Sequence, residues 1–409
     1  MSARRHHRLG LLALAMAGLS APIGQALALS NDQITVYAED RVTSDSNVFR
    51  LPGNLAPPAS SGSTDRGDTY NTLSLGVDFD IPVSLQRFQG GVRLNQTRYQ
   101  RHSSLNFSGH DARAAWLWQI GSAFSGQVGI TNNEFLAPFS DVPGSTVADR
   151  IRQSDVYLNG GYNIGPRLRI QAGTRAFTQR NSDPGRAFND VDVANGTLSL
   201  RYTTAANSWV GLNLESESGR FPNLQPVSGV LVSNNYRQTR AGIEADWTIT
   251  GVSRLNGRID QVNRRYEQLS GRNFSGATAH VEYEWKPTGK LTLVGAAQRD
   301  ISPYEYLRSS MVLVRGVSIR PTLNLTAKTD LTGIVDYNVR SYLTDAATIA
   351  VGGTGGRQDT TRTVGVGVNY QATRTIRIQA NVQRERRTSN VAFGDYSANV
   401  FWLSGRVAF

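Results

Sequence analysis

The amino-acid sequence predicts an all-β fold, a single antiparallel barrel of about 18 strands joined in up-and-down order. Three observations predict it. Apolar and polar residues alternate with a period of two through most of the chain, short and longer connections follow one another in turn, and aromatic residues gather beside the short connections. No helical pattern of comparable length competes with this periodicity.

The strands follow from the alternation itself. In residues 73–81, Leu, Val, Phe and Ile occupy every second position, and Ser, Gly and Asp fill the positions between them. Residues 156–164, 241–249, 279–285 and 364–370 show the same pattern. Successive side chains of a strand point to opposite faces of the sheet, so each segment has one apolar and one polar face.

The connections predict the strand number and the class of barrel. Eight are short and carry turn residues, near 82–86, 121–123, 165–167, 204–207, 250–253, 286–289, 328–330 and 372–374. Nine others, mostly longer and more polar, lie near 50–67, 101–103, 136–150, 181–189, 219–235, 268–272, 301–309, 344–358 and 388–393. Seventeen connections give 18 strands, with 16 as the alternative count. Tight turns at one end and long loops at the other are typical of a transmembrane outer-membrane barrel.

Aromatic residues and the chain end agree with a membrane barrel. Five Trp side chains lie within a few residues of a short turn, where a membrane interface would place an aromatic girdle: Trp116, Trp118, Trp209, Trp247 and Trp285. The chain ends in an alternating apolar strand closed by Phe409, the ending that the barrel-assembly machinery reads. A soluble β-sandwich or propeller would need a second set of elements to cover the apolar faces, and the sequence contains none.

The first residues predict export. Arg4, Arg5 and Arg8 precede a short apolar run, 9–19, and Ala26-Leu27-Ala28 is a small-x-small cleavage site. This is the pattern of a secretory signal peptide. We therefore expect residues 1–28 to be removed near Ala28 and residues 29–409 to form the barrel in the Gram-negative outer membrane. Nucleic acid is then excluded as the physiological partner.

Composition restricts the chemistry. The chain has no Cys, which excludes a disulfide framework, a thiolate metal site and a Cys nucleophile. Only Lys286, Lys290 and Lys328 are lysines among 43 basic residues, and the formal net charge is +11. An Arg-rich, basic surface favours an anionic partner, although codon bias in a GC-rich genome has a share in the excess.

The polar faces of the strands predict a charged lumen. With apolar positions facing lipid, eleven arginines face inward: Arg93, Arg113, Arg169, Arg175, Arg201, Arg240, Arg258, Arg320, Arg340, Arg377 and Arg406. Acids share this register, including Glu244, Asp260 and Asp336. The candidate path for a polar, anionic chain consists of Arg93, Arg113, Arg175, Arg240, Arg258, Arg320, Arg340, Glu244, Asp260 and Asp336. Across the turn at 250–253, Asp246 and Arg258 should be near neighbours on adjacent strands. The alternative is a water-filled wall whose charges pair off.

Nothing in the sequence predicts catalysis. Three His follow the signal segment, His102, His110 and His280, and no G-x-S-x-G motif surrounds a candidate Ser. No His, Asp or Glu spacing matches a metal site. The run Gly352-Gly353-Thr354-Gly355-Gly356 lacks the Lys of a phosphate loop. We expect no catalytic residue, no metal and no cofactor.

The outer end carries a second set of arginines. Eighteen lie near the longer connections: Arg50, Arg66, Arg101, Arg150, Arg152, Arg180, Arg186, Arg220, Arg237, Arg264, Arg265, Arg272, Arg299, Arg308, Arg357, Arg384, Arg386 and Arg387. Facing outward, they would meet membrane lipid and the phosphates of lipopolysaccharide. Arg41, Arg98, Arg315 and Arg362 have no predicted place. If a loop plugs the lumen, the candidates are 50–67, 219–235 and 344–358.

A family resemblance appears in three stretches. Residues 40–51, with the core Ser-Asp-Ser-Asn-Val-Phe-Arg-Leu, resemble the start of EpsL-type proteins, the outer-membrane component of exopolysaccharide biosynthesis operons. Ser84-Leu85-Gln86-Arg87-Phe88 and residues 114–120 look like the same family. The resemblance implies a porin-like barrel that handles or secretes exopolysaccharide, together with periplasmic export components. These motifs sit on a membrane face, at a turn and at a rim, so we expect them to be structural.

The leading hypothesis is therefore export of exopolysaccharide through an Arg-bearing lumen, with no chemistry performed. A general or solute-specific diffusion porin is the first alternative. A non-conducting structural barrel and a barrel-borne hydrolase are the others.

Overall fold

The fold is described by a computed structural model that covers residues 33–141, 144–227, 229–303, 311–343 and 356–409. The predicted signal segment 1–28 lies outside the described residues. Eighteen strands form one sheet: β1 (Ile34–Asp45), β2 (Asp68–Val83), β3 (Gln86–Tyr99), β4 (Phe107–Ile120), β5 (Phe124–Leu136), β6 (Arg150–Ile164), β7 (Leu168–Asn181), β8 (Val191–Thr203), β9 (Trp209–Arg220), β12 (Tyr236–Thr250), β13 (Ser253–Tyr266), β14 (Phe274–Trp285), β15 (Leu291–Pro303), β16 (Met311–Thr326), β17 (Thr329–Leu343), β18 (Gln358–Gln371), β19 (Ile376–Ser389) and β20 (Tyr396–Ala408).

Smaller elements lie in the longer connections. A hairpin of β10 (Gln225–Val227) and β11 (Val230–Val232) follows β9. Single 3₁₀ turns are η1 (Ala59–Ser61), η2 (Ser103–Leu105), η3 (Phe139–Asp141), η4 (Pro184–Asn189) and η5 (Ser270–Arg272). Among the residues that the structure describes, no helix is long and apolar enough to cross a membrane.

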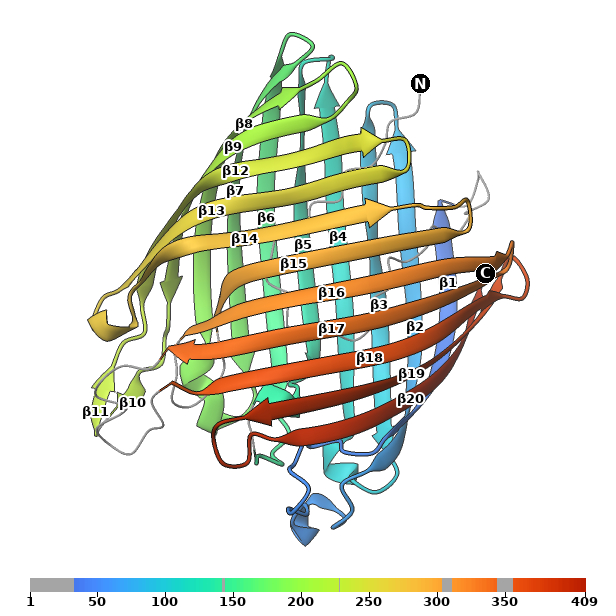
Figure 1. Cartoon of the computed structure of the whole chain (residues 1–409), viewed down its shortest axis with the longest axis vertical. Coiled ribbons are helices and arrows are strands. Elements are labelled where there is room, and N and C mark those ends of the chain that lie inside the picture. Colours follow the sequence, from blue (N-terminus) through green and yellow to red (C-terminus); the bar gives the residue numbers. More distant parts are fainter. Residues whose placement is uncertain (1–32, 142–143, 228, 304–310, 344–355) are drawn as a thin grey trace.

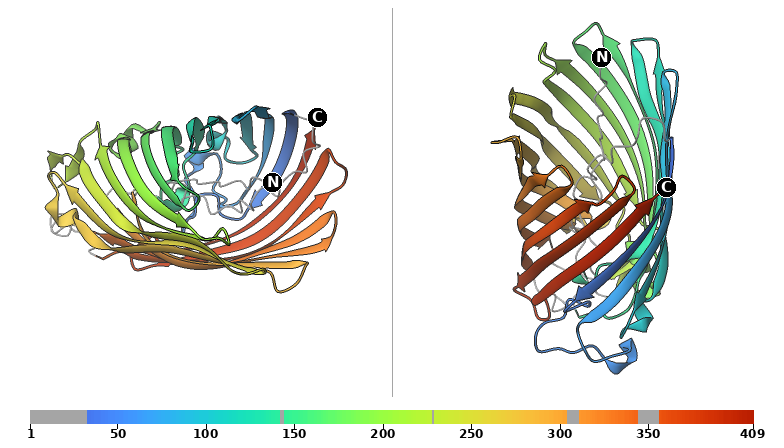
Figure 2. Two further views of the ribbon diagram at one scale, coloured as in Figure 1. Left: turned by 90° about the horizontal axis from the view of Figure 1, so that it is seen from above. Right: turned by 90° about the vertical axis from the view of Figure 1, so that its right-hand side faces the viewer.

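The sheet closes on itself. Each strand pairs antiparallel with its neighbours in sequence, except that β9 pairs with β12 because β10 and β11 form a separate hairpin. The first strand, β1, pairs with the last, β20, from Tyr37↔Ala408 to Asp45↔Val400 (Figures 1 and 2). The predicted count of 18 strands is thereby confirmed, and the alternative of 16 is wrong. The eight short turns and nine longer connections also fall where the sequence places them.

The two faces of the wall differ as the alternation predicts. On β18, Val364, Val366 and Val368 are exposed, whereas Gly365 and Gly367 between them are buried. The same alternation runs through the other long strands, so the outer face is a belt of exposed Leu, Ile, Val and aromatic side chains. A closed sheet satisfies its backbone groups internally, and a belt of this kind is stable against lipid.

The predicted aromatic girdle is correct for only some of its members. Trp116, Trp247 and Trp285 are exposed beside the short turns. Trp209, however, is wrongly assigned, because it is buried and faces the lumen, where the guanidinium of Arg201 lies 3.7 Å from the centre of its ring. Since Val210 and its alternate neighbours take the outer face of β9, the position of Trp209 in the register overrides its apolar character.

Inward tyrosines lie flat over glycines of the next strand. Tyr157 is directly opposite Gly129, as Tyr37 is opposite Gly76, and in both pairs a β-carbon on the glycine would overlap the phenol ring. The missing side chain makes room for a ring packed on the wall, which buries apolar area inside a polar lumen.

Replacing Gly129 with Leu should therefore force the Tyr157 ring away and lower the free energy of unfolding by about 1–3 kcal/mol. Urea unfolding of the barrel in lipid vesicles, followed by tryptophan fluorescence, measures the change. Gly196→Leu is the matched control, since a β-carbon on Gly196 would meet open space. Equal stability of the two variants would contradict the packing role of the glycine.

Candidate functional site: the lumen and its crossing loop

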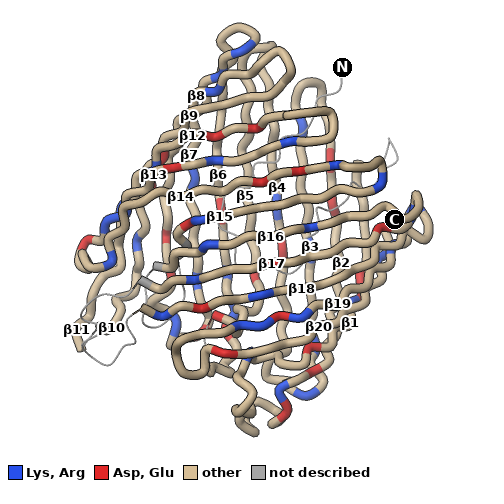
Figure 3. Tube along the Cα trace, viewed as in Figure 1, with Lys and Arg blue, Asp and Glu red and all other residues tan. Residues whose placement is uncertain are grey.

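The predicted lumen charges occupy the inner face of the wall. Each lies at an alternate position to the exposed apolar residues of its strand, as Glu244 does beside the exposed Ile243. This register places Arg93, Arg113, Arg175, Arg240, Arg258, Arg320, Arg340, Glu244, Asp260 and Asp336 on the lumen side. Basic and acidic residues are interspersed along the strands (Figure 3). Their role as a polysaccharide path stays a prediction.

Side chains of β9, β12, β13 and β15 form a buried ion cluster on the inner wall. The first three strands are neighbours, and β14 lies between β13 and β15. The guanidinium of Arg240 is 3.8 Å from Glu215, 3.2 Å from Asp260 and 3.5 Å from Asp300. Arg258 is 3.6 Å from Asp260 and 3.0 Å from Asp300. The Asp260 side chain is fully buried. Two arginines among three carboxylates leave no excess positive charge, so this cluster holds the wall together and does not attract an anion.

Asp246 has two arginines within reach on the adjacent strand. Asp246 lies opposite Asn256, so Arg254 and Arg258 are its two diagonal neighbours on β13. Arg254 is the one that binds it, through two hydrogen bonds, while Arg258 turns to the buried cluster. The prediction that Asp246 and Arg258 are near neighbours on adjacent strands is confirmed, but register alone does not determine which of the two diagonal arginines binds Asp246.

Most of the eleven predicted arginines are neutralised locally. Three further wall pairs are Arg93–Asp111 at 3.5 Å, Arg113–Asp78 at 2.9 Å and Arg175–Asp155 at 2.6 Å. Arg201 is 3.8 Å from Glu244, and Arg406 is 3.6 Å from Asp78. With Arg240, Arg258 and Arg340, eight of the eleven have a carboxylate partner. The structure therefore favours the alternative of a paired, water-filled wall.

Of the other three, Arg169 donates hydrogen bonds to Asn163 and Ser125, whereas Arg320 and Arg377 have no carboxylate at ion-pair distance within the described chain. Arg320 is exposed, and the nearby Asp336 accepts a hydrogen bond from Asn338. Arg377 donates to Gln371 at 3.0 Å and lies directly opposite Arg406. Both interact at longer range with lumen carboxylates, Arg320 with Asp336 and Arg377 with Glu39 and Asp330, so their charges are only partly neutralised.

A loop crosses the lumen. Residues 137–149 connect β5 to β6 and contain η3. On this loop, the carboxylate of Asp141 is 3.2 Å from Arg340 of β17, and the carbonyl of Ser140 accepts a hydrogen bond from Arg387 of β19. β17 lies eight strands from β5 in the closed order (Figures 1 and 2). The loop thus ties one side of the barrel to the nearly opposite side and narrows the passage.

An apolar cluster supports the crossing loop at the mouth. Phe139 of the loop packs edge-on against Phe49, with ring centres 4.8 Å apart. Phe49 is fully buried, and Val48, Leu51 and Leu105 complete the cluster. Three loops, 46–67, 100–106 and 137–149, therefore pack as one unit.

The motif in residues 45–51 builds the base of that unit. Asp45 accepts hydrogen bonds from the Asn47 amide and from Arg50, while the Asn47 side chain bonds Leu51 at both its amide and its carbonyl. These hydrogen bonds hold residues 45–51 in a compact turn, which places Phe49 in the apolar cluster. Burial disfavours the charged form of Arg50, but Asp45 and Glu385 outweigh burial, so its pKa lies above the ordinary value.

The candidate plug loops turn out differently from the prediction. Segment 50–67 does take part through the apolar cluster, but 137–149 crosses the lumen and was not a candidate. In segment 219–235, Gln225 and Asn234 bind Arg272 of the adjacent loop, so that its contacts run along the rim. Most of 344–358 lies outside the described residues. No local signal in 136–150 reveals a contact that depends on residues 199 positions away.

The arginines predicted at the outer end separate into two groups. Five of them are buried and hold loops or the inner wall, namely Arg186, Arg264, Arg272, Arg357 and Arg387, and Arg50 is half-buried. The second group is exposed and includes Arg152 and Arg384. Arg308 lies outside the described residues. Of the four without a predicted place, Arg41 faces inward beside Glu39 at 2.9 Å, and Arg98, Arg315 and Arg362 lie on the outer face.

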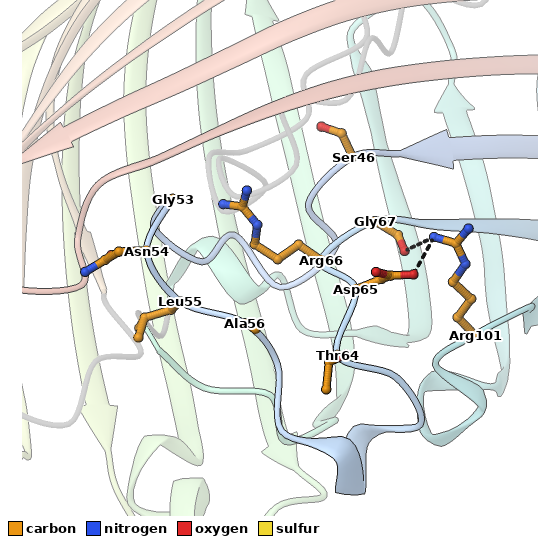
Figure 4. A pocket seen from close by; sticks show the side chains of 10 residues that line it. All are labelled: Ser46, Gly53, Asn54, Leu55, Ala56, Thr64, Asp65, Arg66, Gly67 and Arg101. Atoms are coloured by element: carbon orange, nitrogen blue, oxygen red, sulfur yellow. Dashed lines mark hydrogen bonds and ion pairs between the residues drawn. The ribbon is translucent and has the colours of Figure 1, made fainter.

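A polar hollow of about 490 Å³ opens among the outer loops (Figure 4). Arg101 on its rim is 3.3 Å from Asp65, and Arg66 donates to the Pro52 carbonyl at 3.2 Å. These arginines fix the loop 46–67 in place. The hollow is a surface feature of the mouth and is separate from the lumen wall.

The histidines have structural surroundings. His102 is fully buried, and its ring lies 2.8 Å from the Asp65 carbonyl. His110 contacts Asn132 on the outer face, and His280 lies in the inward register with Glu282 and Glu284. In the described part of the chain, no group of three His, Cys, Asp or Glu side chains could hold a metal ion.

Comparisons with known proteins agree with the geometry. The family model described as "Putative beta-barrel porin 2" matches residues 233–409, the part of the barrel from β12 to β20. Nothing among the curated proteins matches this chain.

Solved structures match almost the whole chain. OpdK from Pseudomonas aeruginosa, crystallised with vanillate, has a TM-score of 0.50 and 12% identity over 92% of this chain and 99% of its own. P. aeruginosa OccK2 in complex with glucuronate has a TM-score of 0.50 and 11% identity over 92% and 98%. A BenF-like porin from Pseudomonas fluorescens Pf-5 has a TM-score of 0.50 and 9% identity over 93% and 100%. This is the fold of an outer-membrane porin. The belt of exposed apolar side chains is consistent with a position in the outer membrane.

The buried cluster gives a test of the wall. Replacing Arg240 with Met should leave Asp260 and Asp300 sharing only Arg258, and the free energy of unfolding should fall by about 3 kcal/mol. The shift of the urea midpoint in lipid vesicles reports it. Arg320→Met should change stability by less than about 0.5 kcal/mol, since Arg320 is exposed and has no carboxylate partner in the described chain. A comparable loss in both variants would mean that the cluster has no special role.

Proposed function

We propose that this chain is a diffusion porin for small polar solutes and that the loop 137–149 sets the size limit. The observation that carries the proposal is the crossing contact from Asp141 to Arg340, which leaves the lumen divided by a packed segment. The match to a porin family model and the likeness to porins crystallised with vanillate and glucuronate support the same class.

The charges of the lumen wall determine which solutes such a pore would pass. Paired charges make a polar, hydrated surface that a sugar or a small acid can touch through many weak hydrogen bonds, and passage requires that no single contact be tight. Arg320 and Arg377 are the exceptions, and their forks suit a carboxylate. A mild preference for small carboxylates over cations follows from them.

Export of exopolysaccharide, which the family resemblance implies, is the second candidate. A polymer passing through this lumen would have to displace the loop 137–149, break the Asp141–Arg340 ion pair and pull Phe139 out of the apolar cluster. The motif that carries the resemblance builds that same cluster. Export through the barrel is therefore the less favoured function.

The loop is tested by its removal. A chain in which residues 139–148 are replaced by Gly-Ser-Gly should conduct several-fold better than the parent chain in planar bilayers and should admit larger sugars in vesicle swelling. Asp141→Asn should raise conductance less and make the current noisier, because one of several anchors is lost. Unchanged conductance after loop replacement would contradict the size limit. No conductance in any variant would favour a structural barrel, and loss of surface polymer in a strain lacking the chain would favour export.

Selectivity gives a second measurement. The parent pore should show a weak anion preference in the reversal potential across a salt gradient. The double variant Arg320→Glu and Arg377→Glu should reverse that preference, because four units of charge change inside a narrow polar passage. Arg98→Glu, on the outer face, is the control and should leave the reversal potential unchanged. A cation preference in the parent pore would contradict the charge assignment of the lumen.

A further inference from the structure

The outer face of the barrel carries a row of arginines at the end of the apolar belt nearest the long loops. They are Arg98, Arg150, Arg152, Arg180, Arg220, Arg237, Arg265, Arg299, Arg315, Arg362, Arg384 and Arg386, each in the register of exposed apolar residues on its own strand. Within the described strands, Asp40, Glu134 and Asp192 are the carboxylates of this face. Most lumen arginines lie beside a carboxylate, whereas most arginines of the outer face have no ion pair with a described carboxylate.

Several of these arginines are directly opposed across strands. Arg237 faces Arg265, Arg299 faces Arg315, and Arg362 faces Arg386. Like charges directly opposite each other destabilise a sheet. Another opposed pair, Arg152 and Arg180, is relieved by Glu134 and Asp192 at 2.8 Å and 2.6 Å. The first three have no ion pair with any described carboxylate, so the described part of the chain supplies no anion that would relieve them.

The densest group lies on β17 to β20. Tyr337, Arg362, Arg386 and Ser397 are partners in successive strands at one height, and Arg384 lies opposite Asn399 just below. The Arg362 guanidinium is 5.7 Å from the centre of the Tyr337 ring, which orients it along the wall. We call these six residues the rim patch. It offers three guanidinium forks, two hydroxyls and an amide, the donors that phosphate oxygens accept from.

An apolar surface continues directly below the rim patch. Val364 is the cross-strand partner of Arg384, Val382 lies one register step further down, and Phe401 is the partner of Val382. These three side chains are 55%, 55% and 49% exposed. A free phosphate ion would use only the upper part of this surface. A molecule with a phosphorylated head and hydrocarbon chains would use both parts.

We propose that the rim patch binds a phosphorylated lipid of the outer leaflet, the lipid A part of lipopolysaccharide. The phosphate groups pair with Arg362, Arg384 and Arg386, and the acyl chains lie along Val364, Val382 and Phe401. Charge complementarity and the position at the edge of the apolar belt both select an anionic lipid. The proposal does not depend on whether the lumen conducts.

The test is binding of lipid A to the full chain in detergent micelles. Diphosphorylated lipid A should bind the parent barrel and should bind the triple variant R362Q/R384Q/R386Q about 100-fold more weakly, because a basic residue near an anionic lipid surface contributes on the order of fivefold. The same lipid with its phosphates removed should not distinguish the two proteins. Native mass spectrometry counts the bound lipid, and the urea midpoint confirms that the variant is folded.

A matched control removes equal charge from the other end of the barrel. R167Q/K290Q/R374Q changes three exposed basic residues at the short turns and should bind lipid A as the parent does. Equal weakening in both triple variants would overturn the proposal, since net charge alone would then explain binding. Equal affinity for the phosphorylated and dephosphorylated lipids would overturn it too, as would competition by inorganic phosphate alone at similar concentration, which would indicate a simple ion site.

Discussion

Closure of the backbone hydrogen-bond ladder is the constraint on which the rest of the structure depends. The seam between β1 and β20 leaves no open edge, so every strand has two neighbours and the backbone needs no water on the lipid side. Once the wall is closed, side-chain alternation determines the environment of each strand residue. One residue in two faces lipid, and the next faces the hydrated lumen, where polar side chains require hydrogen-bond or ion-pair partners. The buried cluster around Arg240 and the tyrosine rings over Gly76 and Gly129 are solutions to that second problem.

Charge is divided between the two faces in opposite ways. Inside, most arginines are within ion-pair distance of a carboxylate, which makes a polar surface with little net potential. Outside, opposed arginines such as Arg362 and Arg386 have no carboxylate partner among the described residues. The basic character of the chain is thus mainly a property of its outer rim. Arg320 is one of the few interior arginines without a carboxylate at ion-pair distance in the described chain.

Local patterns made the wall predictable and left the interior undetermined. Strand number and turn positions follow from alternation and turn residues, which are short-range features of the sequence. The face of Trp209 does not follow from its residue type, because an aromatic residue suits either side, and alternation alone does not determine whether Arg254 or Arg258 binds Asp246. The crossing loop could not be foreseen, since Asp141 and Arg340 meet only after the barrel has closed. Residues 45–51 were correctly expected to be structural, although their role under the loop was not apparent.

The compact turn at residues 45–51 also affects the order in which the barrel assembles. Its contacts reach the last strands of the chain: Asn47 donates to the Ser397 carbonyl, Ser46 exchanges hydrogen bonds with Asn399, and Arg50 lies 3.5 Å from Glu385. Ser397 and Asn399 lie 350 and 353 positions after their partners Asn47 and Ser46 and are therefore synthesised much later. The apolar cluster and the loop that rests on it therefore come together only when the first and last strands meet. Before β1 and β20 pair, the loop 137–149 would lack this support and would not narrow the lumen. The narrowed passage therefore forms only when the barrel closes.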